Sequence, residues 1–186
     1  MKKVLLTDVD GVLVDWIGSF GKFAEKKGFD LKMPTPKTWE MTEWFGETPE
    51  KIDELIKEFN GSESFASIPA FEDAQKIIPI LADHYDIVAI TCCSDDQKVV
   101  ERRTKNLEVF GVKFKDIHCL PQTASKTDLL KSYSPTIWVE DRIEGAEAGH
   151  RLGHKSFLRK STYNEMCSNK EIKIVSTWEE ILKFGL

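Results

Sequence analysis

Short apolar runs alternate with helical patterns along most of this chain, and that alternation limits the possible folds more than any other feature. The runs lie at residues 3–8, 86–93, 117–120, 136–141, 155–159 and 172–175. Strands that are apolar on both faces, with helices between them, are typical of a parallel sheet covered by helices on both sides. We therefore predict an α/β fold with a Rossmann-like parallel sheet flanked by helices.

The helical patterns are bounded by recognisable start and stop residues. Thr177 and Glu180 form a capping box at the start of the last pattern. Pro79 lies inside the pattern at 71–84, and we expect it to kink or split that helix. Helices are predicted at 16–27, 49–60, 71–84, 95–110, 125–132, 142–152 and from 178 onward.

Residues 16–68 differ from the rest of the chain, because they carry helical patterns and no strand pattern. Within this stretch, residues 29–47 contain two prolines and several aromatic residues, which predicts a loop with one short helix at most. We expect two parts: a core built from residues 1–15 and 69–186, and a small helical insertion at 16–68.

Composition excludes several classes of protein. No apolar run reaches the roughly 20 residues needed to span a bilayer, and the first run is too short for a signal peptide, so we expect a cytoplasmic protein. The chain has 26 basic and 31 acidic residues, a net charge of −5, which disfavours binding to long nucleic acids. Cys92, Cys93, Cys119 and Cys167 lack the spacing of metal ligands and are expected to be buried, reduced thiols.

Polar residues gather where the predicted strands end. Asp8 and Asp10 close the first strand, Thr91 closes the second, and Glu140-Asp141 close the fourth. Lys126 begins the helix after the third strand. Parallel sheets bind ligands beyond the carboxyl ends of their strands, so these groups are expected to meet. Four carboxylates need a cation, for which Mg2+ with oxygen ligands is the simplest choice, and the amine and hydroxyl suit a phosphate.

The two early aspartates suit different chemical roles. A carboxylate such as that of Asp8 can accept a phosphoryl group as an aspartyl phosphate. Asp10 can then give a proton to the leaving oxygen and later take one from water. Gly11 permits a tight turn that leaves both side chains open.

The segment D-V-D-G-V, followed in order by Thr91, Lys126 and Glu140-Asp141, resembles the four motifs of the haloacid dehalogenase-like (HAD) phosphatases. The resemblance implies that Asp8 is the nucleophile and Asp10 the general acid/base, with Thr91 and Lys126 on the phosphate. It also implies Mg2+ bound by Asp8, Asp141 and the backbone carbonyl of Asp10, with Glu140 acting through a metal-bound water. The dehalogenases of the family lack the second aspartate, so its presence favours phosphate chemistry.

The insertion has the position of a HAD cap, and the segments DVDGVLVDW, SKTDLL, VEDR and STWEEIL are similar to those of 5'(3')-deoxyribonucleotidases. In that branch, cap aromatics enclose the base of a nucleoside monophosphate. Trp16 matches one such aromatic, and Cys92 stands where the branch tends to have a phosphate-binding serine. Looser candidates for contact with the base are Phe20, Trp39, Trp44 and Phe45.

Three functions remain open at this point. The favoured one is a Mg2+-dependent phosphomonoesterase that forms an aspartyl phosphate and acts on deoxyribonucleoside monophosphates. The second keeps this chemistry but acts on polynucleotide 3'-phosphate ends or sugar phosphates. The third is a HAD-like binding protein without catalysis, which the presence of all the catalytic groups disfavours.

Several residues also have plain structural explanations. Trp16 and Phe20 have the helical spacing of core residues, and Arg142 is equally suited to contact substrate or to pair with nearby acids. His150 and His154 are predicted to be surface histidines. Asp95 and Asp96 are predicted to cap a helix.

Overall fold

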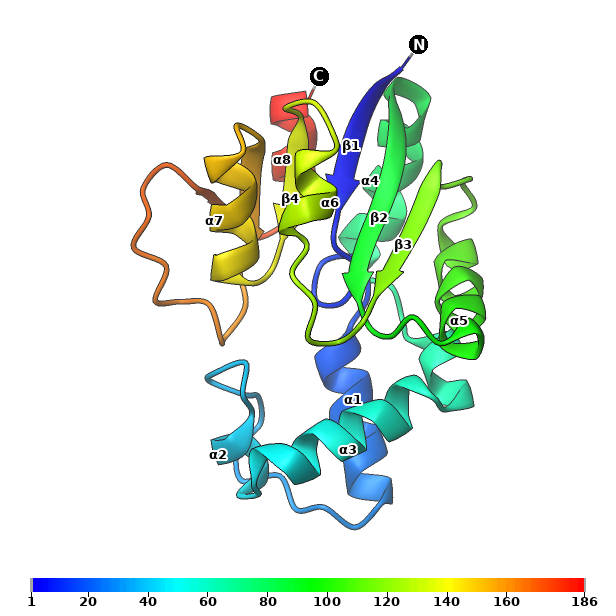
Figure 1. Cartoon of the computed structure of the whole chain (residues 1–186), viewed down its shortest axis with the longest axis vertical. Helices are drawn as coiled ribbons and strands as arrows, with labels where there is room; N and C mark the ends of the chain where they lie inside the picture. Colours follow the sequence, from blue (N-terminus) through cyan, green and yellow to red (C-terminus); the bar gives the residue numbers. More distant parts are fainter. Residues whose placement is uncertain (1, 186) are drawn as a thin grey trace.

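The computed structural model describes residues 2–185 and has a six-stranded parallel sheet at its centre (Figure 1). The strand order is β3-β2-β1-β4-β5-β6. The strands are β1 Lys3–Thr7, β2 Tyr85–Cys92, β3 Asp116–Leu120, β4 Ile137–Glu140, β5 Lys155–Arg159 and β6 Lys173–Val175. All five pairings are parallel, which confirms the predicted α/β fold.

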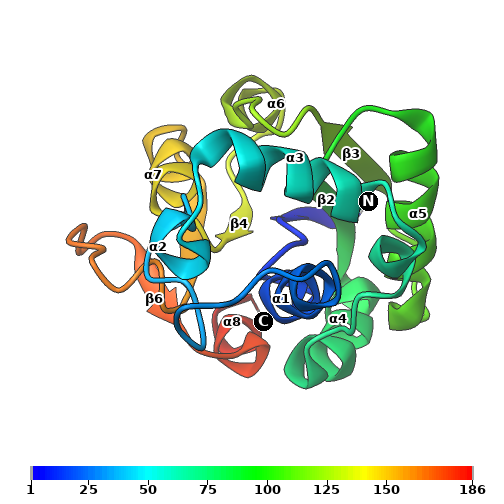
Figure 2. The ribbon, with the colours of Figure 1, turned by 90° about the horizontal axis from the view of Figure 1, so that it is seen from below.

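Helices cover both faces of this sheet, and three more lie beyond its carboxyl end. These three helices, α1, α2 and α3, lie at the lower end in Figure 1. Seen from below, they cross the carboxyl end of the sheet (Figure 2). The helices are α1 Trp16–Lys26, α2 Thr42–Phe45, α3 Pro49–Asn60, α4 Glu72–His84, α5 Gln97–Leu107, α6 Thr127–Lys131, α7 Ile143–Arg151 and α8 Trp178–Gly185, with short 3-10 turns at Glu63–Ser67 and Glu108–Phe110.

Neighbouring residues of each strand point to opposite faces, so an apolar strand supplies two cores. Leu5 packs in the large core with Ile87 and residues of α4 and α8, whereas Leu6 packs on the other face with Val88 and Leu130 of α6. All five side chains are at most 1% exposed. This double burial explains why the strands lack a polar face.

Two helix starts follow the sequence prediction. The Asp96 carboxylate accepts from the amides of Lys98 and Val99, at 2.9 and 3.4 Å, and so caps α5. Glu180 accepts from the Thr177 amide at 3.3 Å, as expected for the capping box before α8.

Two predictions about local structure need correction. Of the two outcomes expected at Pro79, a split is wrong, since α4 runs unbroken from Glu72 to His84 with Ile78 and Leu81 buried on either side of the proline; a kink stays a prediction. His154 is not on the surface: it is 2% exposed, accepts from the Thr136 amide at 3.1 Å and lies 3.0 Å from the Leu130 carbonyl. Gly153, the residue before it, has a φ of +84°. The side chain of His150 is partly exposed and pairs with Glu171.

The two chain segments that connect the first three helices to the sheet run side by side. The Asp15 amide donates to the Pro69 carbonyl at 2.8 Å, and the Phe71 amide donates to the Leu13 carbonyl at 2.9 Å. The entry and exit of the helical insertion are therefore held together by backbone hydrogen bonds, close to Asp10.

The four cysteines are free thiols. Cys93 is buried as predicted, while Cys92, Cys119 and Cys167 are only partly buried. Among the described residues, no helix is long and apolar enough to cross a membrane.

Candidate active site

Three carboxylates meet where β1 and β4 end. Oxygen atoms of Asp8, Glu140 and Asp141 lie within 4.8 Å of one another, and each residue is at most 5% exposed. The Asp8 amide donates to the Val139 carbonyl at 2.8 Å, which continues the pairing of β1 with β4 past the last residue of β1. This pairing holds the Asp8 side chain at the sheet edge beside the Glu140-Asp141 pair.

Lys126 is the cation of this cluster. Its Nζ lies 2.8 Å from Oδ1 of Asp8 and 2.9 Å from Oε2 of Glu140. Burial acts to lower the pKa of Lys126, but Asp8 and Glu140 outweigh it and raise that pKa. Lys126 therefore stays charged and joins the end of β1 to the end of β4.

One ammonium does not balance three buried carboxylates. Burial, then the neighbouring acids, raises the pKa of Asp141 well above its usual value, and burial does the same for Asp8 against the pull of Lys126. Burial opposes ionisation of Glu140 too, but Lys126 and hydrogen bonds lower its pKa to about 2. Fully ionised, the cluster keeps two excess negative charges. Oxygen ligands with that excess fit a hard divalent cation such as Mg2+.

Two residues of the loop after β5 hold Asp141 in place, and the sequence did not reveal either. The hydroxyl of Tyr163 donates to Oδ2 of Asp141. Asn164 Nδ2 donates to the carbonyls of Asp141 and Arg159, both at 2.7 Å. The loop has no periodic pattern, so nothing in the sequence marked these side chains.

Gly11 is required at the turn that directly follows Asp10. Its φ is +74°, a conformation that disfavours residues with a Cβ. A Cβ at this position would also collide with the Asp141 carboxylate and the Tyr163 hydroxyl. Both constraints exclude larger residues beside the acidic cluster.

Asp10 lies in different surroundings from Asp8. Oδ1 of Asp10 accepts from Arg103 Nη2 of α5 at 2.5 Å, and Oδ2 accepts from the Thr91 hydroxyl at 3.2 Å. Arg103 was not predicted from the sequence, although a signal was present. Arg103 follows Val99 by four residues and precedes Leu107 by four, so it falls on the buried stripe of α5.

Cys92 follows Thr91 at the end of β2. Its Sγ donates to the Ala124 carbonyl at 3.4 Å, in the loop that leads to Lys126. Burial raises the pKa of the Cys92 thiol to about 11. This side chain is therefore a neutral, weak hydrogen-bond donor near neutral pH.

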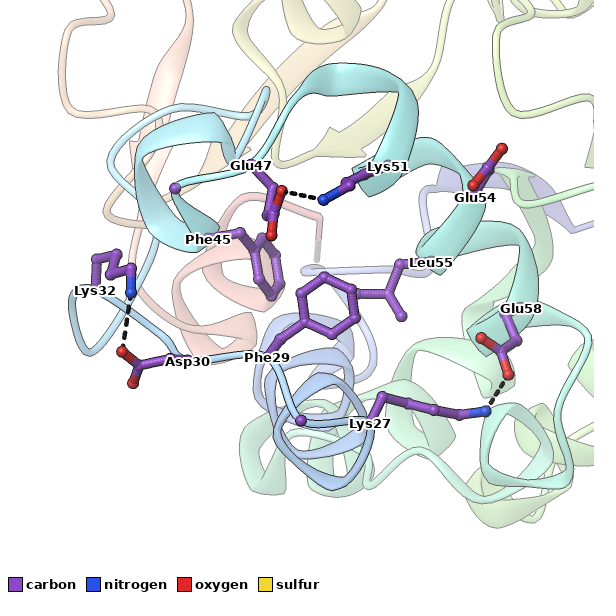
Figure 3. A pocket seen from close by; sticks show the side chains of 12 residues that line it. Lys27, Phe29, Asp30, Lys32, Phe45, Glu47, Lys51, Glu54, Leu55 and Glu58 are labelled. Atoms are coloured by element: carbon purple, nitrogen blue, oxygen red, sulfur yellow. Dashed lines mark hydrogen bonds and ion pairs between the residues drawn. The ribbon is translucent and has the colours of Figure 1, made fainter.

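Most of the candidate base-binding aromatics lie inside the helical insertion. Trp16 and Phe20 stack with ring centroids 4.6 Å apart and are 4% and 0% exposed. Trp44 and Phe45 are also buried, and Phe45 lines a cavity of about 670 Å³ at the outer end of the insertion, with Phe29 and Leu55 and a rim of charged side chains (Figure 3).

Trp39 is the aromatic of this set that packs against Tyr163, the residue whose hydroxyl holds Asp141. Its ring centroid lies 5.6 Å from that of Tyr163, and the Arg142 guanidinium lies 5.0 Å above it. The Thr162 hydroxyl donates to the Pro36 carbonyl at 2.7 Å, next to this contact. The insertion therefore touches the loop that holds Asp141.

The family described as "5' nucleotidase, deoxy (Pyrimidine), cytosolic type C protein" matches residues 2–143. The chain belongs to this family. It is therefore a HAD-like phosphatase near the deoxyribonucleotidase branch, a hydrolase of phosphomonoesters, as predicted.

The individual proteins that the chain resembles share less than a quarter of its sequence. An uncharacterized 32.4 kDa protein of Enterobacteria phage T4 is 24% identical over 197 residues, which cover 97% of this chain and 69% of the phage protein. A haloacid dehalogenase-like hydrolase from Streptococcus pneumoniae has a TM-score of 0.68 at 16% identity, covering 98% of both chains. A Clostridium difficile protein provisionally assigned as a phosphatase has a TM-score of 0.69 at 17% identity, covering 100% of this chain and 99% of its own. At these identities the two structures support the HAD fold alone.

Proposed function

We propose that this protein is a Mg2+-dependent phosphatase that forms an aspartyl phosphate and acts on nucleoside monophosphates. The observation that carries the proposal is the position of Asp8. Its carboxylate lies 2.8 Å from an ammonium and within 4.8 Å of two further buried carboxylates, directly after β1. A nucleophile in such a site can attack phosphorus while the surrounding charges hold the phosphoryl oxygens.

In the first step an Asp8 carboxylate oxygen attacks the phosphorus, and the bond from phosphorus to the ester oxygen breaks. Lys126 and Thr91 bind the phosphoryl oxygens, and Asp10 gives its proton to the leaving alcohol. The proximity of Asp10 to Thr91 supports this division of roles, since it puts the acid beside the phosphate-binding hydroxyl.

In the second step water attacks the aspartyl phosphate and gives its proton to Asp10. Phosphate leaves and Asp8 returns as a free carboxylate, so the atoms and charges of the cycle balance. Asp8, Asp141, Glu140 and the backbone carbonyl of Asp10 are the groups that would hold Mg2+. When bound, the ion neutralises charge on the phosphoryl group.

The proposed cap is the helical insertion at residues 16–68, with the core formed by 1–15 and 69–186. Two observations support it: the insertion lies across the carboxyl end of the sheet, and Trp39 contacts Tyr163 beside the acidic cluster (Figure 2). The family match supports a nucleotide as substrate. Trp16 and Phe20 remain candidates for base contact, and their burial requires the cap to move if they are to reach a substrate.

The test is phosphate release from deoxynucleoside and ribonucleoside monophosphates, 3'-phosphorylated oligonucleotides and sugar phosphates. It is run with Mg2+ and with EDTA, on the wild type and on Asp8→Asn. We expect turnover of deoxynucleoside monophosphates that EDTA abolishes and that Asp8→Asn lowers by at least about 1,000-fold, since the nucleophile is lost.

The other outcomes separate the rival functions. The same losses on oligonucleotide ends or sugar phosphates would keep the mechanism and overturn the nucleotide assignment. Undiminished turnover by Asp8→Asn would overturn the mechanism. No turnover of any substrate would favour the binding protein without catalysis.

A further inference from the structure

Arg103 is a fully buried cation on the side of the site away from Lys126. It is 0% exposed, and its Nη2 lies 2.5 Å from Oδ1 of Asp10. Its Nη1 donates to Oδ1 of Asn106 at 3.0 Å, and its guanidinium carbon lies 4.1 Å from the Phe65 ring centroid. The guanidinium is thus held by a carboxylate, an amide and an aromatic face.

A guanidinium in this position is costly unless it is paired. Removing an ion from water carries a large desolvation penalty, and only good geometry with an opposite charge offsets that penalty. Within residues 2–185, Asp10 is the carboxylate that forms an ion pair with Arg103. Valine or leucine would fill the same stripe of α5 without that cost, so packing alone does not explain an arginine here.

The same network reaches the segment where the chain returns from the insertion to the core. Asn106, which accepts from Arg103, donates through Nδ2 to the Ile68 carbonyl at 2.7 Å. Phe65, under the guanidinium, belongs to the same returning segment and is fully buried. The position of Arg103, and through it that of Asp10, therefore depends on the position of the segment that contains Phe65 and Ile68.

We propose that Arg103 is a positioning residue for the reaction: it holds Oδ1 of Asp10 so that Oδ2 lies beside Thr91, where the phosphoryl group binds. This inference rests on the proposed function. Because the guanidinium occupies Oδ1, Oδ2 is the oxygen left facing Thr91 and the phosphoryl group. Arg103 itself does not touch the substrate.

The kinetic test compares two substrates that differ in their need for an acid. The leaving group of 4-nitrophenyl phosphate departs without a proton, whereas the alcohol of a nucleoside monophosphate needs one. We expect Arg103→Met to lower kcat/KM about 100-fold for the nucleoside monophosphate, in the range of general acid catalysis, and less than about 5-fold for the aryl phosphate. Arg103→Lys should recover part of the loss, since it keeps a cation but not the forked geometry.

Arg102→Met is the matched control. Arg102 is the next residue of α5 and also pairs with the returning segment, through Glu63 at 2.6 Å, but it does not reach Asp10. We expect its kcat/KM for both substrates to stay within about twofold of the wild type, because exposed ion pairs contribute little. Equal losses on both substrates by the Arg103 variants, or the same selective loss in Arg102→Met, would overturn the proposal.

A second measurement does not depend on activity. Melting temperatures of Arg103→Met, Asp10→Asn and the double variant form a cycle that isolates the pair. We expect the double variant to melt no lower than Asp10→Asn, because the arginine is harmful once its partner is gone. Additive losses would overturn the pairing. A wild type that hydrolyses neither substrate would overturn the proposed function, while this cycle would still test the position of Arg103.

Discussion

Asp8 and Asp10 are two residues apart, yet their surroundings are balanced in opposite ways. Around Asp8, three buried carboxylates share one ammonium, and the pKa values of Asp8 and Asp141 rise well above normal because of burial and mutual repulsion. Around Asp10, one carboxylate meets one buried guanidinium. The region around Asp8 has more negative than positive charges, whereas the charges around Asp10 are equal in number.

The difference indicates which side of the site suits a cation. A divalent ion would relieve the excess charge beside Asp8, whereas beside Asp10 it would face Arg103. The ion pair of Asp10 with Arg103 stabilises the fold, while the acidic cluster beside Asp8 destabilises it until a cation or a proton neutralises the excess charge. Functional sites commonly carry such a cost in stability.

The sharpest test of this comparison removes one charge from each side. Asp10→Asn leaves Arg103 buried without an opposite charge, so we expect a loss of about 3 kcal/mol in the free energy of unfolding. Asp141→Asn removes one of three repelling carboxylates, so we expect a gain of about 1 kcal/mol when no metal is present. Urea unfolding in EDTA measures both. Losses of equal size in the two variants would contradict the comparison.

Addition of Mg2+ should affect the two sides differently as well. An ion that binds only the folded protein stabilises it by about 2.7 kcal/mol at 100 times its dissociation constant. We expect that shift in the wild type and in Arg102→Met, and little or none in Asp141→Asn. Thermal unfolding at increasing Mg2+ measures it, with Na+ at matched ionic strength as the control. An equal shift in Asp141→Asn would place the ion elsewhere.

The sequence predicted the Asp8 side of the site better than the Asp10 side, and for a physical reason. Asp8, Lys126 and Glu140-Asp141 come directly after or near strand ends, and parallel strands bring their carboxyl ends to one edge. The strands themselves were predicted because double burial leaves them almost wholly apolar. This reasoning needs only local patterns and one rule of topology.

Arg103 and Tyr163 escaped prediction because their roles arise from tertiary contacts. Arg103 lies 93 residues from its partner Asp10, and Tyr163 reaches Asp141 from a loop without periodicity. His154 was misjudged for the same reason, since its burial depends on carbonyl and amide groups of other elements. The one signal in the sequence was an arginine, Arg103, on an otherwise apolar helical stripe, and that signal does not identify Asp10 as its partner.

A second balanced ion pair, outside the site, provides a reference for the Asp10 side. Arg159 donates to both oxygens of Asp73, at 2.7 and 3.0 Å, and the Trp178 amide donates to the same carboxylate at 2.9 Å. Burial opposes ionisation, but these hydrogen bonds lower the pKa of Asp73. Asp73→Asn should cost about 2 kcal/mol at pH 7, as expected for a partly buried pair.

The cost of Asp73→Asn should depend on pH in one direction. A carboxylate whose pKa is lower in the folded state stabilises the protein above its unfolded pKa of about 3.9, and this stability is lost as the pH falls through the folded value. The gap between wild type and variant should therefore be constant from pH 5 to 7 and shrink below about pH 4. Glu72→Gln, one residue earlier on the surface, should show no measurable change. A gap that widens on acidification would contradict the assignment.

The smallest expected effect concerns the hydroxyl that holds Asp141. Tyr163→Phe removes the hydrogen bond to Oδ2 of Asp141 and leaves the ring against Trp39. Groups that orient a metal ligand commonly change affinity by 10-fold or more, so we expect Mg2+ binding to weaken by about 10-fold. Calorimetric titration of the protein with Mg2+ measures this change. Tyr133→Phe is the matched control, because its hydroxyl lies 2.9 Å from His118, away from the acidic cluster. Unchanged affinity in Tyr163→Phe would show that Lys126, Asn164 and the strand ends fix the carboxylates without help from the Tyr163 hydroxyl.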